Sequence, residues 1–574
     1  MVHRIQELPF ISIVKRSPTL YLIGQEFFLR RETKSWRTLF SKEKAFWKAT
    51  LKKEGEKPSV LIATGIAGHS TGALLESMLA AACTLRGADV HILLCNSILG
   101  ACIITNYPEL EKKNESGGVK IRCNSCVVSG KLWFEHMGLP MHFYEDNVNN
   151  EERRTAHELA ATIPIDAVNT YTYEGIAVGE HALAGALRYY ARGDLTGEPN
   201  SEKILRKYLE SSLLATYAIT NLLSRHHFDV ACFHHGIYSP QGLVGEVCRK
   251  HGVRVVNWNP AYRKHCFIFS HGDSYHHTMI SEPAGVWENV VWDQFLEKRT
   301  MDYLKSRWRG TNDWIWFHDH PEENPLTIQQ EIGADRERPW ITLLTNVMWD
   351  AQLHYKSNAF KNMLEWVLQT IHYFEKRKDL QLIIRVHPAE IRGTLPSRQL
   401  LVDEIKKAIP FLPENVFIIP PDSQVSTYEL AAQSNAVIIY NTKTGIEISS
   451  MGIPVIVAGE AWIRNKGFSL DASSSSDYFS ILDGLPLMHR MSADEISRAR
   501  KYAFHFFFRR MIPLPFVTTK TDRGSELQLS VPSLDHLLPN RYTGLDIICD
   551  GILTGSPFIY PAENETDKSI MNDI

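Results

Sequence analysis

The sequence contains no apolar run that approaches the ~18 residues of a membrane-spanning helix. Its amino terminus, MVHRIQELPFISIVKRSP, lacks the apolar core and the small-residue cleavage site of a secretory signal peptide. We therefore expect a cytoplasmic protein. Aromatic and basic residues do mix through Trp47. That mixture is compatible with peripheral contact with an inner membrane surface or an assembly complex, although a helical extension packed on the first domain is the favoured interpretation.

The sequence also lacks an excess of charge of either sign. It has 62 Lys and Arg against 65 Asp and Glu, a formal net charge of −3. Proteins that bind nucleic acid usually present a basic surface to the phosphates, so we expect no nucleic acid partner. An anionic ligand would have to be held by a local site.

Cysteine is scarce, with nine residues, an odd number, mostly in apolar segments. This suits buried thiols in a reducing cytosol. Cys123 and Cys126 form the only Cys-x-x-Cys, and a structural zinc needs four ligands. Local packing is therefore the favoured role for this pair. No HExxH pattern occurs, and we predict no metal site even at the paired histidines His234, His235, His276 and His277.

A dinucleotide fingerprint is absent as well. The loop GIAGHSTG at 65–72 follows a predicted strand, Val60–Thr64, and precedes a predicted helix, Ala73–Arg86. It is not G-x-G-x-x-G, and no suitably placed acidic residue follows the next strand. The loop instead places His69 at the end of a strand. A histidine with a pKa near neutrality could deprotonate a hydroxyl there; the alternative is a loop histidine that forms a backbone hydrogen bond.

The region from Leu382 to Leu470 is rich in strand signals. Three short apolar runs, Leu382–Val386, Ala436–Tyr440 and Pro454–Ala458, are bounded by Pro, Gly or Asn and alternate with helical patterns. This alternation predicts an open α/β sheet of parallel strands. In such a sheet, ligands bind beyond the carboxyl ends of the strands.

Polar residues stand at those strand ends. His387 and Pro388 follow the first run, and the segment from Asn441 to Gly445 joins the second run to a short helix. Backbone N–H groups and hydroxyls there would form an anion site, and a carboxylate in the first helical turn could accept two ribose hydroxyls. The predicted nucleotide-binding residues are Arg385, His387, Pro388, Thr442, Lys443, Thr444, Gly445 and Glu447. The alternatives are helix capping for the threonines, a dipole contact for Glu447 and a structural role for His387.

A second group of candidates follows other predicted strands of the amino-terminal half. Phe228–Phe233 is a predicted strand that ends in His-His-Gly-Ile-Tyr, so the parallel-sheet rule puts His235 and Tyr238 on the same rim as His69. Asp273 follows a short apolar run, and its carboxylate could orient a histidine or bind acceptor hydroxyls.

The motifs RVHPAE, VSTYELAAQSNAVIIYNTKTGIEISSMGIPVIV and GEAWIRNKGF resemble the carboxyl-terminal lobe of the capsule polysaccharide biosynthesis family. The resemblance is strongest over 385–468. It implies an α/β protein with two Rossmann-like lobes (the GT-B architecture), a helical insertion, and carboxyl-terminal helices that pack back on the first lobe. Thr442 and Thr444 replace the serines usual in the second motif. We divide the chain into an extension (1–57), an acceptor lobe (58–330), a nucleotide-sugar lobe (331–510) and a returning segment (511–574).

The resemblance implies a metal-independent glycosyltransferase without a cofactor. The enzyme would move a sugar from a nucleotide-activated donor to a polysaccharide or glycolipid acceptor. A CMP-Kdo-like donor is favoured, and UDP- and GDP-sugars remain alternatives. His387 would stabilise the leaving phosphate, and His69 or Glu174 would be the base, because the Glu174 region begins an insertion that faces the cleft in the family. Two other functions stay open: a nucleotide-sugar epimerase, and a non-catalytic component of a capsule assembly complex that binds nucleotide sugar or glycan.

Overall fold

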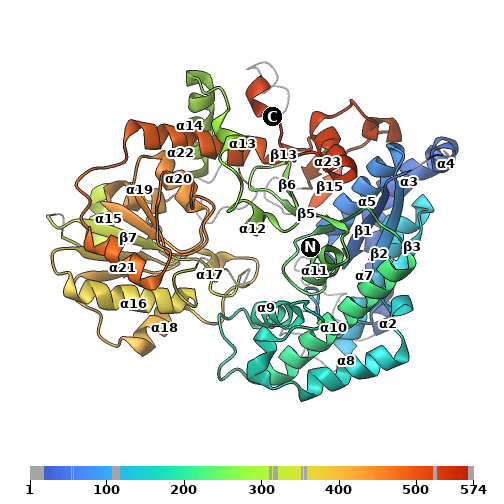
Figure 1. Ribbon diagram of the computed structural model, residues 1–574, viewed down its shortest axis with the longest axis horizontal. Coiled ribbons are helices and arrows are strands. Elements are labelled where there is room, and N and C mark those ends of the chain that lie inside the picture. The colour runs from blue at the N-terminus through green and yellow to red at the C-terminus, as the bar shows by residue number, and fades with distance from the viewer. Residues whose placement is uncertain are drawn as a thin grey trace.

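The structure is a computed structural model that describes residues 18–52, 55, 57–105, 117–308, 313, 321–335, 337–350, 353, 358–520 and 526–565. Residues 1–17 of the amino-terminal stretch considered above for membrane contact lie outside the described residues. Figure 1 shows two α/β lobes side by side, each built around its own sheet. The amino-terminal half of the chain forms the lobe on the right, and residues from about 340 to 500 form the lobe on the left.

The first lobe contains a seven-stranded sheet of order β13-β6-β5-β4-β1-β2-β3. Strands β1 to β5 are parallel, and β6 runs antiparallel to both of its neighbours. The strands are β1 (Ser59–Gly65), β2 (Asp89–Leu94), β3 (Met141–Phe143), β4 (Val230–His234), β5 (Arg254–Pro260), β6 (Cys266–His271) and β13 (Met511–Pro513).

Helices cover both faces of this sheet. The helices are α2 (Pro18–Glu32), α3 (Lys34–Lys42), α4 (Lys44–Leu51), α5 (Ser70–Leu85), α7 (Gly117–Phe134), α8 (Asn150–Thr162), α9 (Val178–Tyr190), α10 (Ser201–Arg225) and α11 (Gln241–Lys250). One core contains residues of α3, α4 and α5, and the core on the other face contains residues of α8 to α11. Helices α9 and α10 approach closely at Gly185, where a Cβ would lie 2.5 Å from the Tyr208 ring.

The second lobe contains a six-stranded parallel sheet of order β12-β11-β10-β7-β8-β9. Its strands are β7 (Trp340–Leu344), β8 (Gln381–Arg385), β9 (Val416–Ile419), β10 (Ala436–Ile439), β11 (Val455–Val457) and β12 (Leu470–Asp471). The predicted strands at 382–386, 436–440 and 454–458 are therefore confirmed as β8, β10 and β11, which shift by at most one residue at each end.

The helices of the second lobe follow its strands in alternation. They are α15 (Pro325–Ile332), α16 (Met363–Lys376), α17 (Ala389–Arg392), α18 (Leu401–Ala408), α19 (Thr427–Gln433), α20 (Thr444–Ser450) and α21 (Ser475–Asp483). Strands β7, β8, β10 and β11 are buried on both faces, which explains why they have continuous apolar runs rather than alternating patterns.

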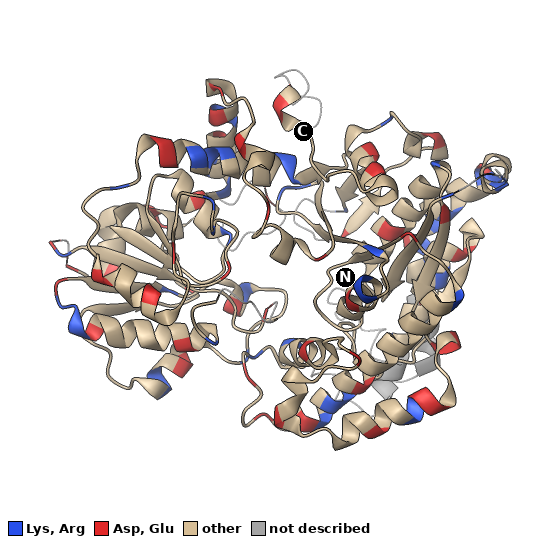
Figure 2. Cartoon of the chain, viewed as in Figure 1, with Lys and Arg blue, Asp and Glu red and all other residues tan. Residues whose placement is uncertain are grey.

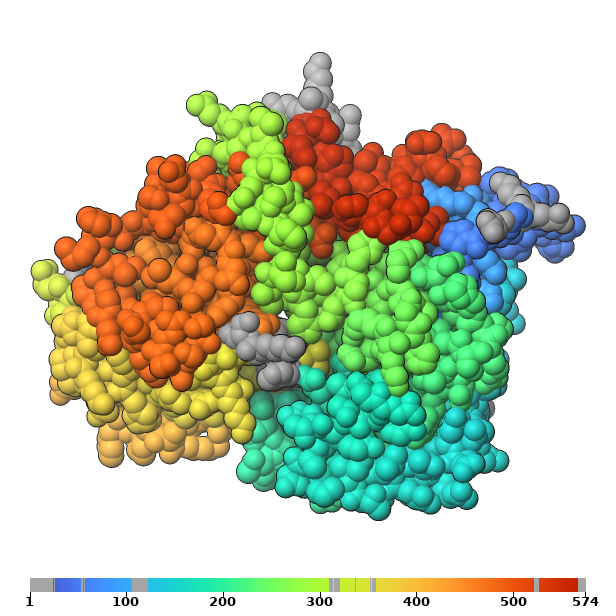
Figure 3. Space-filling model, in the orientation of Figure 1, coloured from blue at the N-terminus to red at the C-terminus, as the bar shows by residue number. Residues whose placement is uncertain are grey.

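The chain crosses between the lobes twice. The short helices α12 (Tyr275–Thr278) and α13 (Gly285–Glu288) lead to α14 (Gln294–Trp308), which packs against α22 (Ala493–Phe504). Helix α22 continues as a π-helix, His505–Arg509, into β13, which pairs with β6 of the first sheet. The hairpin β14 (Val517–Thr519) and β15 (Leu527–Leu529) and helix α23 (Thr543–Thr554) then lie on the first lobe. Figure 3 shows this red segment against the green and blue surface of that lobe.

Charged residues of both signs are spread along the helices of both lobes, and neither sign dominates the view in Figure 2. Among the described residues, no helix combines the length and the apolar character needed to cross a bilayer.

Candidate active site

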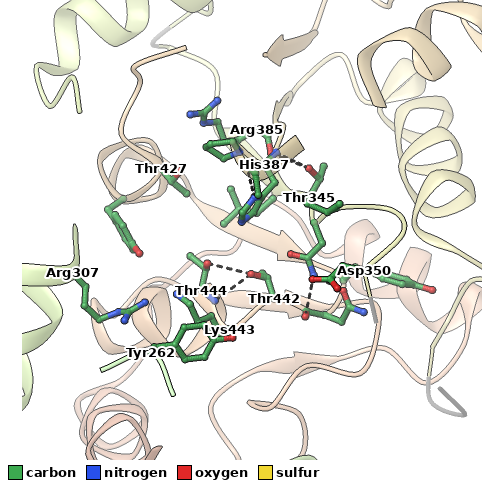
Figure 4. A pocket seen from close by; sticks show the side chains of 18 of the residues that line it. Tyr262, Arg307, Thr345, Asp350, Arg385, His387, Thr427, Thr442, Lys443 and Thr444 are labelled. Atoms are coloured by element: carbon green, nitrogen blue, oxygen red, sulfur yellow. Dashed lines mark hydrogen bonds between the residues drawn. The ribbon is translucent and has the colours of Figure 1, made fainter. Parts of the chain in front are cut away.

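A pocket of about 400 Å³ lies between the lobes, at the carboxyl ends of β7, β8 and β10. This volume is within the range of small-ligand sites. The loops that follow these strands supply most of the wall, and Tyr262 and His276 of the first lobe face them. Arg307 and Trp308 at the end of α14 close one side. The pocket therefore stands where an open parallel sheet binds its ligands, and both lobes contribute to it (Figure 4).

His387 lies in the pocket with a defined tautomer. Its Nδ1 accepts a hydrogen bond from the Ala389 backbone N–H at 3.0 Å, so the proton of the neutral imidazole is on Nε2. Its own backbone N–H donates to the Thr345 hydroxyl at 3.1 Å. These two bonds fix the ring, which can offer an N–H donor to an anionic ligand. The structure thus brings His387 to the pocket wall beside Pro388, as predicted.

The loop after β10 forms the adjacent wall. Thr442, Lys443 and Thr444 all line the pocket. The Thr442 hydroxyl donates to the Thr444 hydroxyl at 3.2 Å and accepts from the Thr444 backbone N–H at 3.4 Å. The side-chain amide of Asn346 donates to the Asn441 side chain at 2.6 Å and ties the ends of β7 and β10 together. The following helix, α20, has only seven residues, so the hydroxyls and Lys443 are the more substantial donors.

Lys443 belongs to a network of buried charged residues at the pocket wall. Its Nζ lies 2.9 Å from Glu447 Oε1 and 4.8 Å from the centre of the Tyr262 ring. Arg307 lies 3.3 Å from the same carboxylate oxygen and also contacts Asp313. Burial, with the nearby Arg307 charge, lowers the pKa of Lys443 from its ordinary 10.5 to about 8. Lys443 is therefore a cation in the pocket wall that is close to losing its proton at neutral pH.

Glu447 does not line the pocket, which corrects its predicted role as a ribose acceptor. Its side chain is fully buried, and both carboxylate oxygens are occupied: Lys443 and Arg307 contact Oε1, and the Tyr428 hydroxyl donates to Oε2. Burial alone would raise its pKa, but the Arg307 and Lys443 charges hold the pKa at about 2. Glu447 is thus a permanent anion that positions the two cations.

Arg385 is also a structural residue rather than a phosphate ligand. Arg385 is among the residues that line the pocket, but its guanidinium donates to the carbonyls of Pro420 and Ser423, at 2.6 and 3.1 Å. Figure 4 shows the guanidinium turned away from Lys443 and Thr444. Gly445 is outside the pocket lining because it packs on the core: a Cβ there would lie 2.7 Å from Ile439.

The first lobe presents a cluster of histidine and tyrosine rings. The rings of His69 and His234 are stacked 4.9 Å apart, and His235 lies 4.9 Å from the Tyr238 ring and 6.4 Å from the His276 ring. The structure therefore brings His69, His235 and Tyr238 to one rim, as the parallel-sheet rule predicted. His276 continues this cluster into the pocket.

His69 is not arranged as a base. It is the N-cap of α5, and its Nδ1 accepts from the Gly72 backbone N–H at 3.2 Å. The proton of the neutral ring is then on Nε2, so neither nitrogen can take a proton from a hydroxyl while this bond persists. Burial, with the Arg188 charge, lowers its pKa to about 4. This is the backbone-bonded alternative considered in the sequence analysis, and it corrects the prediction of His69 as catalytic base.

Glu174 is distant from the pocket, which corrects its prediction as the second candidate base. Its side chain is 61% exposed and pairs with Lys250 at 3.0 Å. Lys250 is the last residue of α11, whose first residue follows the His235 loop. Ten helical residues span about 14 Å, and a helix between parallel strands runs back towards their amino ends. Glu174 therefore lies at the opposite edge of the sheet from the histidine cluster.

The two remaining acceptor-side predictions have defined contacts. The Tyr238 hydroxyl donates to Asp350 at 2.9 Å across the lobe boundary. The Asp273 carboxylate accepts from His277 Nδ1 at 3.1 Å and from the Ser274 backbone N–H at 2.6 Å. Asp273 does not line the pocket, so of its two predicted roles the structure has it orient a histidine.

Sequence reasoning missed several residues of the pocket wall. Arg307 is distant in sequence from every strand-end loop and carried no motif signal, although it is central to the charge network. Tyr262 likewise lines the pocket from a loop without a recognisable pattern. Glu460 and Trp462 also line it, and both belong to the GEAWIRNKGF motif, although neither was singled out. Asp350 follows β7 and lies in the wall, as the parallel-sheet rule predicts.

Residues 311–483 match the family model described as capsule polysaccharide biosynthesis protein. The match falls on the second lobe of the chain. No curated protein sequence matches the chain. The matched segment contains β7 to β12 and the strand-end loops of the pocket, so the family match covers most of the pocket wall.

The solved structures that match this chain have low sequence identity to it. The KpsC beta Kdo 2,4 transferase of Thermosulfurimonas dismutans is 12% identical, with a TM-score of 0.33, over 54% of this chain and 87% of that one. The UDP-GlcNAc 2-epimerase of Methanocaldococcus jannaschii is 12% identical, with a TM-score of 0.25, over 78% of this chain and 98% of that one. Spinosyn rhamnosyltransferase SpnG is 11% identical, with a TM-score of 0.24, over 78% and 95%. The GT-B architecture of this chain rests on its own two facing Rossmann-like lobes.

Proposed function

We propose that this protein is a glycosyltransferase that moves a sugar from a nucleotide-activated donor to a surface-polysaccharide or glycolipid acceptor. The supporting observation is the pocket between the lobes, where the His387 imidazole, the Thr442 and Thr444 hydroxyls and the Lys443 ammonium converge. The donor that we favour is a CMP-Kdo-like sugar, with UDP- and GDP-sugars as alternatives. The family resemblance implies this preference.

In this mechanism the second lobe stabilises the leaving nucleotide. Charge develops on the phosphate as the bond to the sugar breaks, and fixed N–H and O–H donors stabilise that charge best where water is excluded. His387 presents its Nε2–H, because its Nδ1 is held by the Ala389 backbone. Lys443 contributes a positive charge, and Glu447 holds it in place at 2.9 Å. These side chains supply the positive charge locally, so we propose transfer without a metal ion at this pocket.

The acceptor hydroxyl would lose its proton to a group of the opposite wall. His276 and Asp350 line the pocket near the first lobe. Burial lowers the pKa of His276 to about 4, partly offset by the Asp350 charge, so its ring is neutral at pH 7. We place the base in this pair rather than at His69 or Glu174.

A nucleotide-sugar epimerase is the second candidate. That activity needs acid and base groups beside the sugar, and Asp350, Glu460 and His276 together line the pocket. An epimerase would convert the donor sugar with no glycan acceptor, whereas a transferase would release nucleotide only with an acceptor or slowly with water. Mass spectrometry and NMR of the products distinguish the two.

The first test is thermal denaturation with CMP, UDP and GDP, on wild type and on His387→Ala. A ligand that binds only the native state raises the melting temperature. We expect CMP to stabilise the wild type and His387→Ala to lose the effect. The control is His372→Ala, which removes a histidine with a 63% exposed side chain on α16 and should keep the full shift. If no nucleotide stabilises the wild type, the donor pocket is refuted. If a nucleotide binds but no sugar reacts, the protein is a non-catalytic component of capsule assembly.

A further inference from the structure

Three histidines from separate elements meet at one end of the first sheet. His91 is on β2, His142 is on the neighbouring edge strand β3, and His226 directly follows α10. One ring nitrogen from each lies within 4.8 Å of the other two. His91 Nδ1 and His142 Nε2 are 2.8 Å apart, and the His142 and His226 ring centres are 4.7 Å apart. Residues far apart in the sequence thus aim imidazole nitrogens at one point.

The surroundings of this cluster suit a metal ion. His91 and His142 are half-buried, and neutral imidazole nitrogens are metal ligands. The Phe228 ring packs edge-on against His91 at 5.2 Å and shields one side. His226 is exposed and leaves the other side open to solvent.

We propose that His91, His142 and His226 bind a divalent transition-metal ion of the zinc class. Imidazole is a ligand for zinc, copper and nickel, whereas magnesium and calcium take oxygen ligands. Zinc–nitrogen bonds of about 2.1 Å at tetrahedral angles hold two ligand nitrogens ~3.4 Å apart. His91 and His142 need to separate by only ~0.6 Å to reach that spacing, and the exposed His226 ring can rotate inward. Water would occupy the fourth position.

A carboxylate next to one of the three histidines supports this assignment. Asp89 lies two residues before His91 on β2, and its Oδ2 is 3.5 Å from His91 Nε2. A proton on Nε2 would face this carboxylate and leave the Nδ1 lone pair for the metal. Metal-bound histidines commonly donate their other N–H to a carboxylate in this way.

The position of the cluster indicates a structural ion. His91 is near the start of β2, and His226 lies between the end of α10 and the start of β4. Both positions are at the amino-terminal end of the parallel strands, whereas the pocket lies at carboxyl ends. The ion would link the end of α10 to the edge of the sheet through its bonds to the three histidines. It should not be needed for sugar transfer. This inference is independent of the proposed function.

The test is zinc binding to the full chain after removal of metal with a chelator. Isothermal titration should show one zinc per wild-type chain and no comparable binding of magnesium. His226→Ala removes an exposed ligand and should weaken zinc binding at least ~10-fold. The matched control is His227→Ala, whose side chain is 86% exposed beside the site and pairs with Asp229; it should bind zinc like the wild type.

The melting temperature with zinc and the zinc affinity of a further variant test the same site. Zinc should raise the melting temperature of wild type and His227→Ala, but not of His226→Ala, and circular dichroism of each apo-protein checks that the variants fold. Asp89→Asn should weaken zinc binding by about 10-fold or more through the outer shell. The proposal is overturned if the wild type binds no zinc, or if His226→Ala keeps wild-type affinity. Loss of zinc with His276→Ala instead would place the ion at the pocket and also overturn it.

Discussion

Replacing Glu447 by Gln distinguishes a buried anchor from a ribose ligand. Its pKa falls from the ordinary 4.5 to about 2, and each pKa unit is worth ~1.4 kcal/mol. The ionised carboxylate therefore stabilises the fold by about 3 kcal/mol at neutral pH. Removing one partner of a buried ion pair costs about 3–5 kcal/mol in general, because Arg307 and Lys443 would keep an uncompensated charge. For a lobe of this size, 1 kcal/mol shifts the melting temperature by about 2–4 °C, so the second lobe should melt ~6–12 °C lower.

The assay is calorimetry of wild type and Glu447→Gln at pH 7 and at lower pH. The folded-state pKa lies below the unfolded one, so the stabilisation is complete above pH 4.5 and is lost as pH falls towards 2. The difference between the two proteins should shrink over that window. Glu375→Gln on the exposed side of α16 is the control and should change stability by less than ~0.5 kcal/mol. A variant with wild-type stability and no nucleotide affinity would refute the anchor role and restore the ribose contact.

Two other substitutions test the pocket and the lobe contact. Lys443→Met should weaken nucleotide binding by about 10- to 100-fold, since a charge-assisted hydrogen bond is worth ~1.5–3 kcal/mol. The nucleotide affinity of the wild type, measured by titration, should fall as pH rises through about 8, where Lys443 loses its proton. If Lys443→Met shows the same fall in affinity with pH, Lys443 is not the group that titrates. Tyr238→Phe removes the 2.9 Å bond to Asp350 and should open the lobes, seen as a larger radius of gyration in X-ray scattering. Tyr373→Phe, which removes a similar bond to Asp483 within the second lobe, should leave the radius unchanged.

Strands β8, β10 and β11 of the second lobe could be predicted because they are buried on both faces. Their short apolar runs were bounded by Pro, Gly and Asn, and the structure confirms them within about one residue. The same logic located the pocket, since parallel strands carry their ligand loops at their carboxyl ends. His387, Thr442, Lys443 and Thr444 all line it. Position along the chain was therefore sufficient to find the part of the wall that the strand-end loops supply.

Side-chain direction was not predictable in the same way. Arg385 and Glu447 are at the expected positions, but one reaches the carbonyls of the 420–423 loop and the other is buried under Lys443. The direction of the Glu447 side chain is set by its contact with Arg307, which lies on α14 and is 140 residues earlier in the sequence. A buried carboxylate must contact a cation that neutralises its charge. The sequence contains no local signal for a partner that is so distant along the chain.

The histidines at the strand ends show why the chemical role of a residue was harder to predict than its position. A strand end with a histidine suggests a base, yet base chemistry depends on which ring nitrogen has a free lone pair. His69 gives Nδ1 to the Gly72 N–H because the loop closes into α5 at that residue, and this single backbone bond reverses its expected chemistry. His387 makes the analogous bond with Ala389, and there the bond favours the expected role, since a phosphate needs a donor. The same local geometry thus excludes one histidine as a base and suits the other as an anion ligand.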